Sequence, residues 1–245
     1  MRHPEPSSRL VALLRESSPL LVLTGAGVSR ESGIATFREA GGLWEGVDPA
    51  EVATPEAFGR DPHRVWRFYD ARRRQGATAR PNPAHVAIAA LEESGRPFLL
   101  ATQNVDGLHE RAGSRSMVRL HGSLWRVRCT ACGDEWEDDR PAIEPLPPAC
   151  PCGALLRPAV VWFGEALPQE AFAQAQAMAR RAALCLVVGT SALVYPAAAL
   201  PEEALAAGAY VVEINPEPTP LSPFASEVLS GPAGEVLPAL LRAAA

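Results

Sequence analysis

Short, almost wholly apolar runs recur along the chain and set the strongest limit on its fold. They are too short for helices, and most are continuously apolar rather than alternating, as expected of strands covered on both faces of a parallel sheet. The sequence therefore predicts strands at Leu20–Leu23, Phe98–Ala101, Met117–Leu120, Leu184–Val188 and Tyr210–Ile214, with a weaker candidate at Glu227–Leu229.

Patterns typical of helices lie between these runs. Ser7 and Ser8 precede leucines at helical spacing, and Asn82-Pro83 is typical of an N-cap followed by proline at the first helical position. Two alanine-rich stretches, "LPQEAFAQAQAMARR" and "PAAALPEEALAAG", favour helices later in the chain, the second interrupted early by Pro201. Because strands and helices alternate, we expect an α/β fold with a doubly wound, Rossmann-like parallel sheet.

Glycine or small polar residues directly follow five of the predicted strands. In chain order these tails are "TGAG", "TQNVDGLHE", "HGS", "GTS" and "NPE". Ligands of open α/β sheets bind just outside the carboxyl ends of the strands, so the tails predict a long polar ligand across one sheet edge. The alternative is that these are ordinary loop residues.

Composition and charge exclude several classes of function. The chain is 47% hydrophobic, carries a net charge of −5 and has no apolar run near the ~20 residues of a membrane helix. We therefore expect a cytoplasmic protein with neither a membrane nor a specific nucleic-acid partner. All 23 basic residues are arginine, which excludes lysine Schiff-base chemistry and Walker-type phosphate binding. The oligomeric state stays open.

Four of the five cysteines form two close pairs, Cys129-x-x-Cys132 and Cys150-x-Cys152. Four thiolates can enclose a tetrahedral Zn²⁺ and leave no open coordination position, so the spacing predicts one structural zinc ion. We expect this ion to hold a small zinc-ribbon module. Unpaired thiols or a redox pair are the alternatives, and Cys185 is interpreted as a core residue.

The order of the motifs is similar to that in one family. "GAGVSRESGIATFR", "TQNVDGLHERAG", "LHGSL", the four-cysteine ribbon, "VVWFGE", "GTS" and "EINPE" follow one another as in the sirtuins, the NAD-dependent protein deacylases, from about Leu20 to Ala233. The resemblance implies that NAD is a consumed co-substrate and that acylated-lysine proteins are the substrates. The expected products are free lysine, nicotinamide and O-acyl-ADP-ribose.

The resemblance also implies a division of the chain into three parts. These are a discontinuous Rossmann-like NAD-binding domain, a cofactor loop with a helical module, and the zinc-ribbon module. The first comprises 1–35, 83–121 and 159–245, the second 36–82, and the third 122–158.

Several site residues follow from the same resemblance. It implies that His121 is the catalytic base for a ribose hydroxyl, that Asn104 orients the ribose and that Asp106 holds the carboxamide. Phe37 and Arg38 would close onto the ribose, and a glycine-rich turn would let the backbone approach the pyrophosphate. The further residues expected to contact NAD are Gly25, Ala26, Gly27, Ser29, Glu31, Ser32, Thr36, Trp44, Gln103, Val105, Gly189, Thr190, Ser191, Asn215, Pro216, Glu217 and Ala233.

The "VVWFGE" segment resembles the sirtuin strand that pairs with the substrate peptide by β-augmentation. The resemblance places substrate contacts at Val161, Phe163, Gly164 and Glu165, with Phe163 walling the tunnel for the lysine stem.

Tyr69-x-x-Arg72 resembles the class III sirtuins, which remove succinyl and malonyl groups. The two side chains share a helix face, and a guanidinium with a phenol hydroxyl can bind the carboxylate of such an acyl group. We interpret Arg73 and Arg74 as a solvated basic face. His85 and His109 are interpreted as structural or surface residues.

Four alternatives stay open. The first is an NAD-dependent deacetylase without a preference for acidic acyl groups. An NAD-linked dehydrogenase would need a third glycine where Arg30 stands, and an acidic residue at the end of its second strand. A zinc-ribbon module that binds nucleic acid or protein is disfavoured by the net charge and the polar strand tails. Within the sirtuin interpretation, ADP-ribosyl transfer is a minor alternative.

Overall fold

The six predicted strands form one parallel sheet in the order β3-β2-β1-β7-β8-β9. The computed structural model describes residues 5–36 and 47–245. Each strand begins at the predicted residue, and the strands are β1 Leu20–Thr24, β2 Phe98–Thr102, β3 Met117–Arg119, β7 Leu184–Val188, β8 Tyr210–Asn215 and β9 Glu227–Ser230. Because β1 pairs with β2 on one side and with β7 on the other, the chain reverses its direction of travel across the sheet at β1. That reversal is where open α/β sheets bind ligands.

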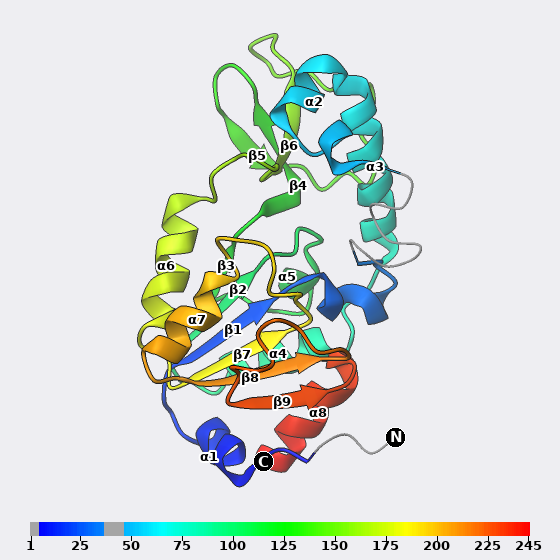
Figure 1. The fold of residues 1–245 in the computed structure, drawn as a ribbon. Helices are drawn as coiled ribbons and strands as arrows, with labels where there is room; N and C mark the ends of the chain where they lie inside the picture. Colours follow the sequence, from blue (N-terminus) through cyan, green and yellow to red (C-terminus); the bar gives the residue numbers. More distant parts are fainter. Residues whose placement is uncertain (1–4, 37–46) are drawn as a thin grey trace.

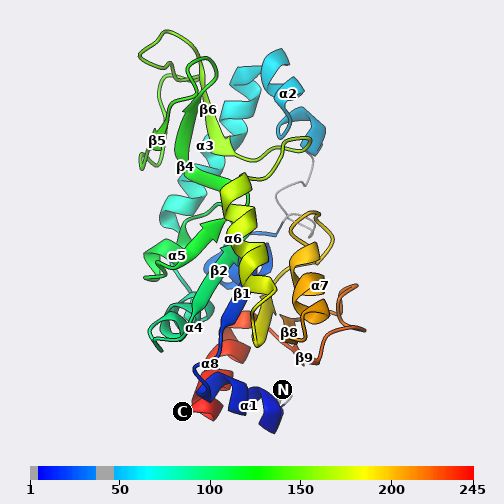
Figure 2. The ribbon, with the colours of Figure 1, turned by 90° about the vertical axis from the view of Figure 1, so that its left-hand side faces the viewer.

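Helices cover both faces of the sheet, as the doubly wound prediction requires (Figures 1 and 2). One face packs against α1 Ser8–Arg15, α4 Pro83–Glu92 and α8 Ala233–Ala244, and the other against α6 Gln169–Ala179 and α7 Ala199–Ala206. Alternate side chains of each strand point to opposite faces. Leu20 and Val22 of β1 accordingly enter one core cluster, and Leu21 and Leu23 enter the other.

Local sequence signals explain where several helices begin. The Ser7 side chain caps α1, and the Asn82 side chain caps α4 with Pro83 at its first position, as predicted. Pro201 lies in the first turn of α7, where its missing amide has no intrahelical partner to lose, so it does not interrupt the helix. Helix α8, which contains Pro238, was not predicted from the sequence.

The smaller lobe combines helices and an antiparallel sheet around one core (Figure 1). Its sheet has the order β5-β4-β6 and lies beside two helices. Phe58 and Trp66 of the helices pack with Val127, Leu156 and Trp162. The elements are α2 Pro55–Arg60, α3 Pro62–Thr78, β4 Gly122–Cys129, β5 Glu135–Glu137 and β6 Leu156–Val160. The remaining short elements of the described residues are η1 Ala26–Ser32, η2 Pro49–Glu51 and α5 Leu108–Arg111.

The prediction that Arg73 belongs to a solvated basic face is wrong. Its side chain is 1% exposed, pairs with Asp138 at 2.8 Å and donates to the backbone carbonyls of Leu124, Asp138 and Arg140. Consecutive residues of a helix point in different directions, so three adjacent arginines cannot all face water on a packed helix. Arg74 is more than half exposed, as predicted, and pairs with Asp70 one turn earlier.

None of the helices in the described part of the chain combines the length and the apolarity that a bilayer span needs.

Candidate active site

Two glycine-containing loops meet at the point where the sheet reverses. The Gly25 amide donates to the Val188 carbonyl at 3.1 Å, and the Gly27 amide donates to the Gly189 carbonyl at 2.8 Å. A Cβ atom on Gly27 would lie 2.7 Å from the Gly189 oxygen, and one on Gly25 would lie 2.8 Å from Cβ of Thr190. The loops that follow β1 and β7 approach each other so closely that side chains are excluded at these positions, whether or not a ligand is bound.

A cavity of about 270 Å³ opens beside these loops. Its lining residues are Gly27, Arg30, Glu31, Gly189, Ile214, Pro216, Pro232 and Ala233. Glu31 accepts the amide of Gly234 at 2.7 Å, at the beginning of α8. The cavity joins predicted NAD contacts from four separate segments. Bare backbone at the sheet reversal suits a pyrophosphate, and the mostly apolar cavity beside it suits a flat base, so these residues fit a dinucleotide.

A buried polar cluster connects the loops after β1 and β2. The Ser29 hydroxyl donates to Asp106 Oδ2 at 2.8 Å, and Asn104 Nδ2 donates to Ser29 Oγ at 3.2 Å. The Leu108 amide donates to Asp106 Oδ1 at 2.8 Å. Burial raises the pKa of the Asp106 carboxyl, and the Leu108 and Ser29 hydrogen bonds oppose that rise. Three predicted residues from two separate motifs thus form one contact network.

A second set of contacts joins the tails of β2, β7 and β8. Gln103 Nε2 donates to Thr190 Oγ1 at 3.0 Å, and Asn215 Nδ2 donates to the Thr190 carbonyl at 3.2 Å. Ser32 Oγ accepts from Asn82 Nδ2 at 3.0 Å. Among the other residues predicted to contact NAD, Ala26, Thr36 and Val105 are partly buried, and Ser191 and Glu217 are exposed. The predicted contacts Phe37, Arg38 and Trp44 lie outside the described residues.

His85 and His109 pack against polar residues at the end of β1 and after it. Both are buried, and their ring centroids are 4.8 Å apart. His85 Nε2 lies 3.3 Å from Ser29 Oγ, and His109 Nε2 lies 3.0 Å from Thr24 Oγ1. Burial lowers the pKa of His85 to about 3 and the pKa of His109 to about 4. The structure makes both residues structural rather than surface, and nothing in the sequence showed the contact between His85 and Ser29.

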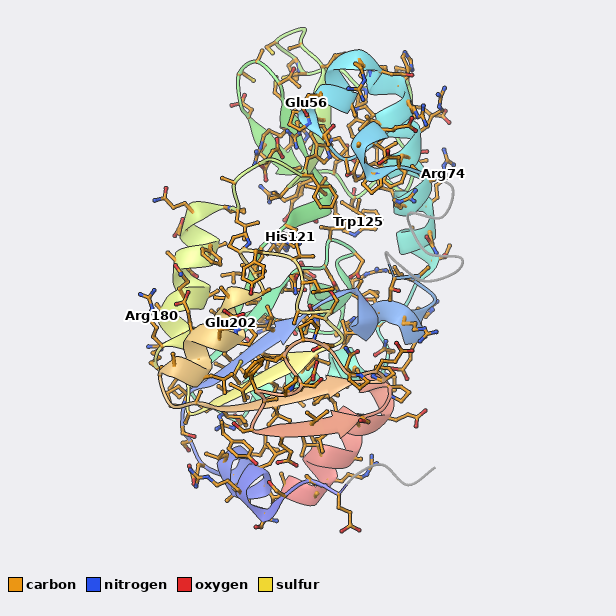
Figure 3. All side chains as sticks on the ribbon, viewed as in Figure 1. Glu56, Arg74, His121, Trp125, Arg180 and Glu202 are labelled. Atoms are coloured by element: carbon orange, nitrogen blue, oxygen red, sulfur yellow. The ribbon has the colours of Figure 1, made fainter. Side chains whose placement is uncertain are left out.

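His121 lies where the two lobes join (Figure 3). Its Nδ1 is 3.1 Å from the backbone carbonyl of Gln103. A carbonyl only accepts, so Nδ1 carries the proton of the neutral ring and Nε2 keeps a lone pair. Burial lowers the pKa of His121, with that hydrogen bond opposing it. A histidine in this state can accept a proton near neutral pH.

The segment after β6 contacts both the histidine and the helical part of the small lobe. The Val161 amide donates to the His121 carbonyl at 2.9 Å, and the Phe163 amide donates to the Ala53 carbonyl at 3.0 Å. The Phe163 side chain is 54% exposed, and Gly164 has a φ of 86°. Glu165 pairs with Arg157 at 2.5 Å and accepts the Trp162 amide, so its carboxylate holds this turn together.

Tyr69 and Arg72 enter an aromatic cluster on α3. The Tyr69 hydroxyl accepts from Trp162 Nε1 at 3.0 Å, and burial raises the Tyr69 pKa. Arg72 Nη1 donates to the Phe68 carbonyl at 2.9 Å, and its guanidinium lies 3.3 Å from the centre of the Phe68 ring. Burial lowers the pKa of Arg72 to about 10, and Tyr69 opposes that shift. No role for Trp162 or Phe68 was predicted from the sequence.

The four clustered cysteines come together as predicted. Their sulfur atoms all lie within 4.8 Å of one another, with 3.5 Å between Cys129 and Cys152 and 3.8 Å between Cys132 and Cys150. Zinc at about 2.3 Å from four tetrahedral sulfurs places those sulfurs roughly 3.8 Å apart, so the donor set fits this ion. Backbone amides of Ala131 and Cys132 donate to Cys129 Sγ and lower the pKa of that thiol.

Comparison with known proteins gives consistent matches over the whole chain. The model of the Sir2 family matches residues 25–196. The chain is 56% identical over 230 residues to NAD-dependent protein deacylase 2 of Pyrobaculum aerophilum, covering 94% of this chain and 92% of the relative. A crystal structure of a Sir2 homolog–NAD complex superposes with a TM-score of 0.92 at 48% identity, covering 100% and 96% of the two chains. A Sir2–p53 peptide–NAD⁺ structure gives a TM-score of 0.85 at 33% identity, covering 97% and 98%.

Proposed function

The chain belongs to the Sir2 family and is an NAD-dependent protein deacylase, and we propose a preference among its substrates. Lysine acyl groups that end in a carboxylate, such as succinyl and malonyl, are preferred over acetyl. The observation that carries the proposal is a guanidinium, that of Arg72, held partly out of water beside Tyr69. On this proposal the substrates are acyl-lysine proteins, and the products are free lysine, nicotinamide and O-acyl-ADP-ribose.

The residues around the sheet reversal have complementary roles in the proposed reaction. NAD supplies the ribose that accepts the acyl group. The phosphates would lie against the Gly25–Gly27 turn, where the Ala26 amide is the donor, because the amides of Gly25 and Gly27 already donate to protein carbonyls. The cavity residues would hold the adenosine half. Asn104 orients the nicotinamide ribose, and Asp106 with its adjacent backbone binds the carboxamide. Ser29 holds both of these side chains in place through its hydroxyl.

His121 acts as the base in this scheme. Its Nδ1 proton is committed to the Gln103 carbonyl, so Nε2 is the atom that takes a proton from a ribose hydroxyl. The Val161 amide on the His121 carbonyl connects this base directly to the segment that pairs with the substrate peptide. Phe163 covers the lysine stem, with Val161, Gly164 and Glu165 as the neighbouring peptide contacts.

The acyl preference follows from the cost of burying a guanidinium. Burial disfavours the charged form of Arg72, which lowers its pKa, although the Phe68 ring beneath the guanidinium favours the cation. A carboxylate placed against Arg72 compensates for the hydration that the guanidinium loses on burial, and the Tyr69 hydroxyl adds a further donor. Hydrogen bonds to charged groups contribute about 1.5–3 kcal/mol each, or roughly one to two orders of magnitude in rate constant or affinity. An acetyl group cannot make these contacts.

The direct test compares acetyl-, malonyl- and succinyl-lysine versions of one peptide, with and without NAD, by mass spectrometry. Replacement Arg72→Met should lower kcat/KM for the succinyl peptide roughly ten- to hundredfold and leave deacetylation unchanged. Arg67→Met is the matched control, because Arg67 lies on the same helix and is exposed to solvent. That control should leave all three activities unchanged.

The possible outcomes separate the parts of the proposal. Equal losses on all peptides, or no loss on any, contradict the acyl preference and favour a deacetylase without acidic-acyl selectivity. Absence of nicotinamide release with every peptide contradicts deacylation altogether. Formation of NADH, seen by its absorbance, would instead indicate the dehydrogenase alternative.

A further inference from the structure

The indole of Trp125 makes a direct contact with the loop that carries Asp106. Trp125 lies in β4 of the small lobe, near the junction that also holds His121 (Figure 3). Its Nε1 donates to the backbone carbonyl of Asp106 at 2.7 Å. The same carbonyl accepts a second hydrogen bond from Arg111 Nη2 at 3.3 Å. Two donors from different elements therefore fix the position of one peptide group.

The packing around this indole leaves it little freedom to move. Gly107 has a φ of 76°, and a Cβ atom there would lie 2.8 Å from both Cδ1 and Nε1 of Trp125. A Cβ atom on Gly76 of α3 would lie 3.3 Å from Cζ2 of the same ring. The guanidinium of Arg73 lies 5.2 Å from the ring centre. Glycine on both sides thus allows the indole to sit between α3 and the Asp106 loop.

We propose that Trp125 is a positioning residue for the nicotinamide half of NAD, acting through Asp106. Its hydrogen bond fixes the Asp106 backbone, while Ser29 and the Leu108 amide fix the Asp106 carboxyl. The small lobe thereby sets the geometry of a group that contacts the co-substrate in the large lobe. This inference rests on the role of Asp106 in the proposed function.

The location of Trp125 predicts which ligands should bind more weakly when this residue is replaced. NAD and free nicotinamide both carry the carboxamide that meets Asp106, whereas ADP-ribose lacks it. The glycine loops and the cavity that hold the ADP-ribose part do not include Trp125. A positioning role therefore affects nicotinamide and NAD but not ADP-ribose, whereas a general loss of structure would affect all three.

The test replaces Trp125 with phenylalanine, which keeps an aromatic ring and removes the N–H donor. Trp125→Phe should raise the inhibition constant of nicotinamide and the KM for NAD roughly three- to tenfold, the effect of one lost hydrogen bond. The Kd of ADP-ribose, measured by calorimetry, and the KM for acyl peptide should not change. Trp136→Phe is the matched control, since Trp136 lies opposite Val127 in the same small sheet and should leave all four constants unchanged.

Each result has a definite meaning. An unchanged inhibition constant for nicotinamide in Trp125→Phe overturns the inference, and so does a parallel weakening of ADP-ribose. If Trp125→Phe does not fold, Arg111→Met removes the other donor to the Asp106 carbonyl and should give the same separation of nicotinamide from ADP-ribose. A wild-type protein that releases no nicotinamide from NAD with any acyl peptide refutes the proposed function instead, which is a different result.

Discussion

Acidification should destabilise this fold mainly through the buried pair His85 and His109. Both rings are almost fully buried, and their pKa values are lowered to about 3 and about 4. The unfolded chain binds protons at these residues once the pH falls below about 6.5, whereas the folded protein does not. The stability they contribute is therefore present above pH 6.5 and is lost as the pH falls toward the folded values.

The size of the loss follows from the same values. Each histidine contributes about 1.36 kcal/mol per pH unit over this window, so between pH 6.5 and pH 5 each costs about 2 kcal/mol and the pair about 4 kcal/mol. Asp106 opposes part of this loss, because its raised pKa means that the folded state takes up that proton first. A loss of about 4 kcal/mol from the pair is large beside the total stability of a typical domain, which is about 5–15 kcal/mol.

Urea unfolding at pH 7 and at pH 5 tests this reasoning, with the wild type compared to His109→Gln. Between the two pH values the wild type should lose about 2 kcal/mol more than His109→Gln, because one of the two titrating rings is gone from the variant. His121, whose pKa is also lowered, and the zinc thiolates titrate in acid too, but they are the same in both proteins and cancel in the comparison. Equal losses in the two proteins would refute the assignment of the acid sensitivity to this pair.

Two further predictions concern the active site and the metal. The pH profile of kcat/KM, measured as nicotinamide release, should fall on the acid side with a pKa below 6.5, because burial lowers the pKa of His121 and the protonated ring cannot act as a base; a limb centred above 6.5 would contradict this role. Cys132→Ala should abolish stoichiometric zinc, measured by elemental analysis, and lower deacylation through loss of the small lobe while ADP-ribose binding persists; full deacylation by the metal-free variant would show that the ion is dispensable.

The sheet and several helix starts were predictable because their signals are local. A continuously apolar run such as Leu184–Val188 can only be buried on both faces, and it forms a central strand. Ser7 and Asn82 mark helix starts through caps that involve only neighbouring residues. By contrast, α8 was missed, because its proline and glycine read as loop residues although the helix packs on α4.

The cysteine cluster was predictable from the sequence, whereas most side-chain contacts around the candidate site were not. Four sulfurs within reach of one ion follow from their spacing. The direction of Arg73 does not, because a run of arginines gives no sign of which one meets the Asp138 carboxylate in a distant segment. Ile214 and Pro232 line the cavity through the pairing of β8 and β9 and the placement of α8, which only the tertiary fold determines. The expected roles of Phe37, Arg38 and Trp44 stay predictions.

The core of the small lobe joins the residues proposed to recognise the acyl group to the cysteine cluster. Cys129 and Cys150 belong to the same buried cluster as Tyr69 and Trp162, and Trp66 Nε1 donates to the Leu156 carbonyl on β6 at 2.7 Å. A zinc ion bound by these cysteines would join the end of β4 to the segment before β6, and through the shared core it would also support the helix that carries Arg72. In the proposed function, co-substrate binding depends on the large lobe, and His121 lies where the two lobes meet. If Arg72 recognises the acyl group as proposed, substitutions on α3 should alter acyl selectivity without disturbing the proposed dinucleotide site, provided that the small sheet keeps that helix in place.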